Sequence, residues 1–161
     1  ATGLFLDGLT RRPRVDAARR PSLLRDVSLF VRPYPEGLFL ENVGPVVAND
    51  AYAATTIWSA FRDDPYHGPK VVWGREVNLF LLGVASHLTA LPPRSDDARE
   101  LNDAAMRIQR AVSASGFHSE LWSYGFASGR PAATRYGTGA DVQLWSTTDL
   151  AVQYVWSRIP R

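Results

Sequence analysis

The sequence contains no cysteine and only one lysine, Lys70. The absence of cysteine excludes a disulfide framework, a thiolate nucleophile and a cysteine-based zinc site. No run approaches the roughly 20 apolar residues that a membrane-spanning helix needs, and the N-terminal residues lack the pattern of a signal peptide. We therefore expect no membrane partner, and the cellular compartment stays open.

The basic residues slightly outnumber the acidic ones, 18 to 16, and nearly all of them are arginine. Their only dense cluster lies near the N-terminus and consists of Arg11, Arg12, Arg14, Arg19, Arg20 and Arg25. Salt-dependent binding of phosphates normally requires a basic face rather than one short run. The sequence therefore predicts a solvated surface segment here and no nucleic-acid partner.

Aromatic residues are more informative, because they make up 11% of the chain and include five tryptophans, several of them beside Gly and Asp. Exposed aromatic rings in polar loops are typical of carbohydrate-binding and base-stacking sites. His87 and His118 lack the spacing of paired metal ligands, so we expect neither a metal site nor a cofactor.

The chain has 161 residues, enough for one hydrophobic core. Residues 1–21 show no sustained period and are expected to form an irregular, Arg-rich N-terminal segment. Apolar residues at spacings of three and four then predict five helices, two of which have Asp50 and Ser95 as expected N-terminal caps. The predicted helices cover residues 22–31, 50–61, 75–90, 95–116 and 145–157.

The segments between these helices are rich in Gly and Pro and lack the alternating pattern of a strand. The sequence therefore predicts an all-α fold. Long loops follow alternate helices, whereas residues 91–94 form a short connection. Paired helices with long loops at one mouth predict part of a toroid of helical hairpins. On this interpretation, residues 22–161 form one domain of helical hairpins.

Three segments carry a further signal: GLFLENVGPVVANDAY at residues 37–52, YHGPKVVWGREVNLFLLG at 66–83, and SELWSYG followed by GTGADVQLWSTTDLA within 119–151. In this order they resemble loops in the C-terminal portion of the six-hairpin (α/α)6-barrel glycoside hydrolases, especially the trehalase and processing α-glucosidase group. The first is similar to an L-P-S loop with an acidic pair, the second to Y-W-R-G-P-x-W, and the third to an E-x-Y loop with a Gly-rich stretch. The chain departs from these patterns at His67, where the group has a Trp-Arg pair, and at Leu144, where it has glycine.

The resemblance implies a general base. It places Glu120 at the Glu of the E-x-Y loop, which in inverting members deprotonates the attacking water, and an ionised carboxylate can accept that proton. The alternative is a glutamate of a surface loop. The general acid of the group lies on an earlier hairpin without a counterpart here. Asp63 and Asp64 are the local candidates, although Asp64 before Pro65 equally marks a turn, so the acid is expected on a missing or separate chain.

The same loops offer aromatic rings that can stack on a sugar and polar side chains that can bind its hydroxyl groups. The residues that the resemblance implies for substrate binding are Tyr66, His67, Trp73, Arg75, Asn78, Trp122, Tyr124, Gln143 and Trp145. For Trp145, which opens the last predicted helix, packing is an equal alternative.

These expectations lead to one principal function and one alternative. The chain is expected to be a glycoside hydrolase segment that supplies the general base and part of the sugar pocket of an inverting, α-glucosidase-like enzyme acting on a carbohydrate substrate. The alternative is a non-catalytic helical carbohydrate-binding or accessory subunit. A sugar epimerase or lyase would need a His pair or a Tyr and His base set, which the three histidines do not resemble.

Helices drawn from a larger toroid would expose the faces that neighbouring hairpins cover, and soluble monomers seldom expose large apolar patches. We therefore expect a large apolar interface with a second chain or with a preceding portion of the barrel. Gel filtration and the binding of a hydrophobic dye check this expectation. A compact monomer that binds no dye would contradict it.

Overall fold

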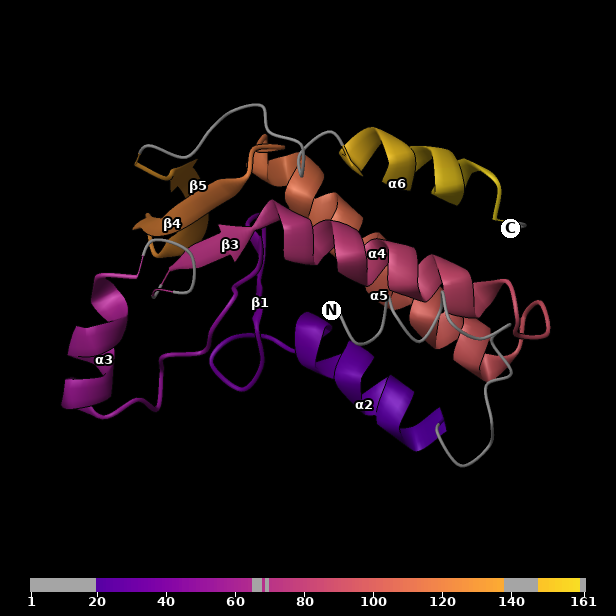
Figure 1. Ribbon diagram of the computed structural model, residues 1–161, viewed down its shortest axis with the longest axis horizontal. Coiled ribbons are helices and arrows are strands. Elements are labelled where there is room, and N and C mark those ends of the chain that lie inside the picture. The colour runs from indigo at the N-terminus through magenta and orange to yellow at the C-terminus, as the bar shows by residue number, and fades with distance from the viewer. Residues whose placement is uncertain (1–19, 65–67, 69, 138–147, 160–161) are drawn as a thin grey trace.

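The computed structural model describes residues 20–64, 68, 70–137 and 148–159. It contains both helices and antiparallel strands, so the expectation of an all-α fold is wrong (Figure 1). The helices are α2 (Arg20–Val31), α3 (Thr55–Arg62), α4 (Gly74–Leu88), α5 (Asp96–Ser115) and α6 (Thr148–Ser157). The strands are β1 (Phe39–Leu40), β2 (Gly44–Pro45), β3 (Val71–Trp73), β4 (Leu121–Ala127) and β5 (Arg130–Arg135).

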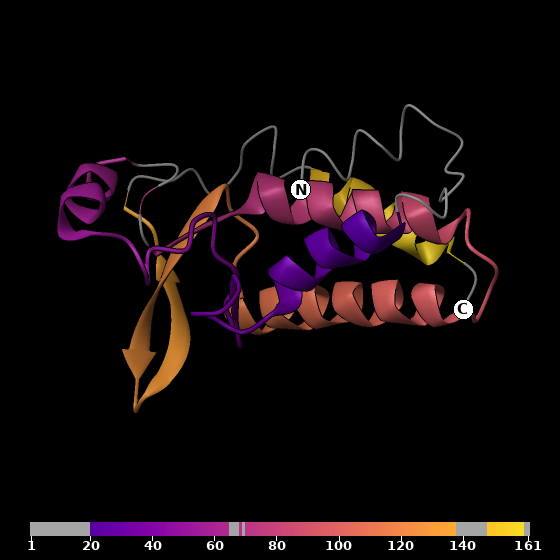
Figure 2. The ribbon, with the colours of Figure 1, turned by 90° about the horizontal axis from the view of Figure 1, so that it is seen from below.

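The four longer helices pack against one another, and the strands gather at one end of them. α5 packs against α2 and α4, and α4 also packs against α6. Figures 1 and 2 show the strands and the short helix α3 at the same end. The predicted start of the last helix, at residue 145, lies outside the described residues. Segments that are distant in the sequence therefore meet at the strand end of the molecule.

The ends of α5 follow from its sequence. The Ser95 hydroxyl accepts a hydrogen bond from the Ala98 N–H at 3.2 Å, and two aspartates in the first turn suit the helix dipole. Gly116 ends the helix with a φ of 72°, a left-handed conformation that glycine adopts without strain. Both ends confirm the helix predicted over residues 95–116.

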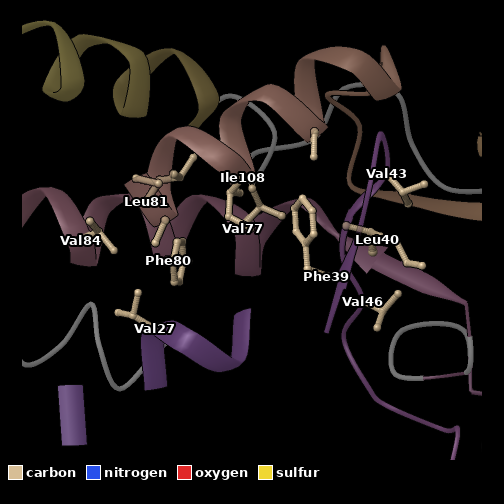
Figure 3. Close-up of a cluster of buried hydrophobic side chains, with 14 of the residues drawn as sticks. Val27, Phe39, Leu40, Val43, Val46, Val77, Phe80, Leu81, Val84 and Ile108 are labelled. Atoms are coloured by element: carbon tan, nitrogen blue, oxygen red, sulfur yellow. The ribbon is translucent and has the colours of Figure 1, made fainter. Parts of the chain in front are cut away.

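The core lies where α2, α4, α5 and the first sheet meet (Figure 3). Val27 of α2 lies next to Phe80 of α4, while Ile108 enters from α5. Phe80 is fully buried, and its ring stacks on that of Phe30 with centroids 4.6 Å apart. The predicted apolar faces of the two central helices are confirmed by their buried residues Val77, Phe80, Leu81, Val84, Leu101, Ala104, Ala105, Ile108 and Ala111.

Two of the predicted helices begin elsewhere. α2 begins at Arg20, two residues before its predicted start at residue 22, and α3 begins at Thr55 rather than at Asp50. Asp50 does not cap α3, because its carboxylate oxygens accept hydrogen bonds from the Tyr34 hydroxyl and the Trp58 indole. Because the Asp50 side chain is bonded to these two donors, it does not cap a helix, and α3 begins about one turn later in the chain.

The strands of the second sheet account for the failure of the all-α expectation. β4 pairs antiparallel with both β3 and β5, in the order β3-β4-β5. Trp122, Tyr124 and Phe126 alternate along β4 with the period of a strand. Ser128 and Gly129, which connect β4 to β5, have φ values of 51° and 75°, as a two-residue hairpin turn of type I′ requires. The Gly-rich composition that predicted a loop here therefore belongs to a hairpin.

The two sheets are joined by hydrogen bonds. β1 pairs with β2 in the first sheet. Just after β2, the Val47 N–H donates a hydrogen bond to the carbonyl oxygen of Val71, the first residue of β3, at 2.8 Å. The Trp122 indole N–H donates to the Val43 carbonyl oxygen at 2.9 Å. Each of the three segments that carry the family resemblance contributes strands to this junction, so all three meet at one end of the helices.

We predict that Phe80→Ala lowers the free energy of unfolding by about 3–5 kcal/mol, because it removes a fully buried ring and leaves a cavity beside Phe30. Leu29→Ala is the control, since Leu29 is 41% exposed on α2, and its loss should be about 1 kcal/mol or less. Urea denaturation followed by circular dichroism measures both changes. Equal losses for the two variants would contradict the described core.

Candidate functional site

The backbone of Glu120 is held against the start of α4. The Gly74 N–H donates a hydrogen bond to the Glu120 carbonyl oxygen at 2.8 Å. A Cβ atom on Gly74 would lie 2.6 Å from the Ser119 carbonyl oxygen, so this close approach requires glycine. β3 ends at Trp73, which pairs with Leu121 of β4. The fold thus places a helix start directly beside the residue expected to act as the base.

Glu120 is buried, with only 5% of its surface exposed. Within the described residues, no lysine, arginine or histidine forms an ion pair with its carboxylate. Glutamates are rarely buried unless they are paired or have a functional role. This burial argues against the alternative of an exposed glutamate in a surface loop.

Three of the residues expected to bind substrate lie at the start of α4. Trp73 is half-buried, and the guanidinium of Arg75 lies 5.2 Å from the centre of its ring. Arg75 also forms an ion pair with Glu76 at 2.7 Å. Asn78 lies one turn further along α4 and is buried, with 7% of its surface exposed. The structure therefore brings Trp73, Arg75 and Asn78 to the helix end that contacts Glu120.

Trp122 and Tyr124 lie at alternate positions of β4 and therefore on the same side of the sheet, and Glu120 immediately precedes this strand. Trp122 is 1% exposed and Tyr124 is 6% exposed, and both belong to the hydrophobic core. The hydrogen bond from Trp122 to Val43 fixes the indole ring in that core. The structure therefore places both aromatic residues in packing contacts of the hydrophobic core.

A groove of about 1290 Å³ begins at this place and is lined by α4, α5 and α6. We call it the helix groove. Gly74, Asn78 and Ser119 line its end at the strands, and Glu120 follows Ser119 in the chain. Two buried polar residues, Asn78 and Ser119, thus line this end of the groove, and the candidate base is the chain neighbour of Ser119.

A second group of polar side chains, which the sequence analysis did not single out, lies between the loop after α2 and α3. Asp50 accepts hydrogen bonds from the Tyr34 hydroxyl at 2.9 Å and from the Trp58 indole N–H at 3.0 Å. Tyr34 also interacts with Tyr124 through their hydroxyl groups. The only signal in the sequence is an aspartate near a helix start, which equally predicts a helix cap.

The environment of Asp50 keeps both tyrosines neutral. Burial, the hydrogen bond to Asp50 and its negative charge raise the pKa of Tyr34 well above the ordinary value of 10.0. Burial and the Asp50 charge also raise the pKa of Tyr124, against an opposite effect of the hydrogen bond with Tyr34. Both hydroxyl groups therefore remain protonated and able to donate hydrogen bonds near neutral pH.

Four of the residues expected to bind substrate lie outside the described residues: Tyr66, His67, Gln143 and Trp145. Asp63, a candidate general acid, ends α3 in solvent with 82% of its side chain exposed, next to Arg62. The backbone N–H of Asp64 donates to the Phe61 carbonyl oxygen in the turn that follows α3.

No family model, curated protein or solved structure matches the chain. Within the described part of the chain, no group of three His, Cys, Asp or Glu residues is placed to hold a metal ion. None of the described helices combines the length and the apolar character needed to cross a bilayer.

We predict that the protein loses stability as the pH rises above about 10, the pKa of an ordinary tyrosine. Folding raises the pKa values of Tyr34 and Tyr124, so the unfolded chain releases these protons first. The contribution of the two tyrosines to the free energy of unfolding is therefore complete below that pH, and it is lost as the pH rises further. Asp50→Asn should reduce the loss, because it removes the charge that opposes ionisation.

Urea denaturation at a series of pH values between about 8 and 11 measures this dependence. Asp63→Asn is the matched control, because its side chain is exposed at the end of α3, and it should keep the profile of the wild type. The assignment fails if Asp50→Asn and the wild type have the same alkaline profile.

Proposed function

We propose that the chain supplies the general base and one wall of the sugar pocket of an inverting glycosidase similar to the trehalase and processing α-glucosidase group. Glu120 is the base, and Trp73, Arg75 and Asn78 form the wall beside it. The observation that supports this proposal is the meeting of the three resembling segments around the backbone contact between Gly74 and Glu120.

Burial of polar residues at this junction adds to that support. Asn78 and Glu120 are both buried, although a junction between a helix and a sheet can be packed with apolar side chains alone. Buried polar groups close to a groove are typical of binding and catalytic sites. Packing alone does not explain why a carboxylate occupies this position.

In the proposed reaction, a water molecule attacks the anomeric carbon while the bond to the leaving oxygen breaks. A carboxylate oxygen of Glu120 accepts a proton from that water, and a carboxylic acid on the opposite face of the sugar protonates the leaving oxygen. In inverting enzymes these carboxyl groups are about 6.5–9.5 Å apart, which leaves room for the water. We assign the acid to another polypeptide segment, because Asp63 is exposed at the end of α3.

We predict that Glu120→Gln slows glycoside hydrolysis by about 10²–10⁴-fold without unfolding the protein, because the amide keeps the shape of the side chain but cannot accept the proton. α-Glucosyl fluoride is the substrate of choice, since fluoride leaves without protonation and the reaction needs little help from a general acid. Proton NMR measures the rate and identifies the first product, which should be the β anomer.

Glu41→Gln is the matched control, since Glu41 belongs to the first resembling segment but has a side chain that is 69% exposed. In Glu120→Ala, azide should replace water as the nucleophile and yield β-glucosyl azide. Three results would overturn the proposal: an unchanged rate in Glu120→Gln, release of the α anomer first, or no hydrolysis by the wild-type chain both alone and with the polypeptides that copurify with it.

A further inference from the structure

The helix groove is larger than a sugar site requires. Its lining runs along α5 from Ala98 to Ser113, a length of about 22 Å at 1.5 Å per residue. Small-molecule sites usually measure about 300–1,000 Å³, whereas this groove measures about 1290 Å³. An α-helix of the same length and about 10 Å in diameter occupies about 1,700 Å³. The groove therefore matches such a helix in length and provides about three quarters of its volume.

The floor of the groove is mainly apolar. Its apolar residues include Leu81 of α4, Met106 of α5, and Val152 and Trp156 of α6. Leu81 and Val152 are buried, and Met106 is half-buried. Trp156 is fixed in the wall by a hydrogen bond of 3.2 Å from its indole N–H to the Leu81 carbonyl oxygen. An occupant of this groove must therefore present an apolar face.

The walls of the groove favour a helix over an extended peptide. Among the described residues, Trp122 is the only strand residue in the lining, and it belongs to the central strand of its sheet. The lining that the structure describes therefore offers no free strand edge, so an extended peptide would bury unpaired N–H and C=O groups against the apolar floor. A helix pairs these groups within its own backbone.

The charges on the rim are mostly positive. Arg94, Arg99 and Arg110 line the groove, and Asp103 is the one acidic residue among the described lining residues. Arg99 is bonded to Asp96. Arg94 and Arg110 have no ion-pair partner within the described part of the chain. Arg94 precedes α5 and Arg110 lies about four turns along it, so the two lie roughly 20 Å apart.

We propose that the helix groove binds an amphipathic α-helix of a partner polypeptide, with its apolar face on the floor and an acidic residue near each end, paired with Arg94 and Arg110. A single small anion cannot reach both guanidinium groups across about 20 Å, whereas a helix of about four turns can. This surface goes beyond the proposed hydrolysis and does not rest on it.

The test uses two designed helical peptides of about five turns that share one leucine face. One peptide carries Glu at both ends of that face, and its twin carries Lys at the same positions. Fluorescence anisotropy of the labelled peptides measures their Kd values for the protein. The wild type should bind the acidic peptide about ten-fold more tightly than its twin, and Arg94→Glu with Arg110→Glu should reverse that preference.

Two further variants control the result. Arg25→Glu with Arg130→Glu changes two exposed arginines outside the lining and should leave the preference unchanged. Asn102→Trp fills the groove from an exposed position on α5 and should remove the binding of both peptides. The proposal is overturned if the wild type shows no preference for the acidic peptide. It is also overturned if Arg94→Glu with Arg110→Glu keeps that preference, or if peptide binding survives Asn102→Trp.

Met106 offers a direct probe, because it is the only methionine in the chain and it lines the groove. Its ¹³C-labelled methyl group gives one NMR signal, which the acidic peptide should shift. A shift caused by higher protein concentration alone would assign the groove to a second copy, and a shift caused by maltooligosaccharides would assign it to carbohydrate. Either result would overturn the proposal. No hydrolysis is measured, so such a failure leaves the role of Glu120 intact.

Discussion

The strand end of the molecule depends on one close approach between two backbones. Gly74 lies where β3 passes into α4, and the Ser119 carbonyl oxygen occupies the space that a Cβ atom would need. The Gly74 N–H is bonded to the Glu120 carbonyl oxygen, and strand pairing continues from Trp73 and Leu121. A larger residue at position 74 would separate β3 from β4. The position of the buried carboxylate relative to α4 therefore depends on the absence of a side chain.

The helices could be predicted because their signals are local. Ser95 and Gly116 mark the ends of α5, and apolar spacing marks its buried face. The strands could not be predicted in the same way, because β3 has only three residues and its pairing partner lies far along the chain. Ser128 and Gly129 carried a local hairpin signal, but glycine there is equally typical of a loop, and the alternation of Trp122, Tyr124 and Phe126 spans only three positions. The role of Asp50 could not be predicted for a similar reason, since an aspartate that caps a helix and an aspartate bonded to a tyrosine can stand in the same local sequence.

The candidate site could be predicted in part. The motifs selected Glu120 and the residues at the start of α4, which the fold brings together. They also selected Trp122 and Tyr124, but an aromatic residue at alternate strand positions faces either a ligand or the core, and only packing in three dimensions separates the two. The helix groove has no sequence signature, because three helices each contribute one wall. It ends beside Asn78, so the two proposed surfaces are continuous.

α3 has no buried side chain, and the Trp58 indole ties it to Asp50. An eight-residue helix without buried side chains is expected to have a small free energy of local opening, which would let its amide hydrogens exchange with solvent while α4 and α5 stay folded. Each opening that withdraws the indole removes one of the two donors that bond the Asp50 carboxylate among the described residues, and leaves Tyr34. Fluctuation of this outlying helix is thereby transmitted through Tyr34 to Tyr124 of β4, the strand that begins directly after the buried carboxylate.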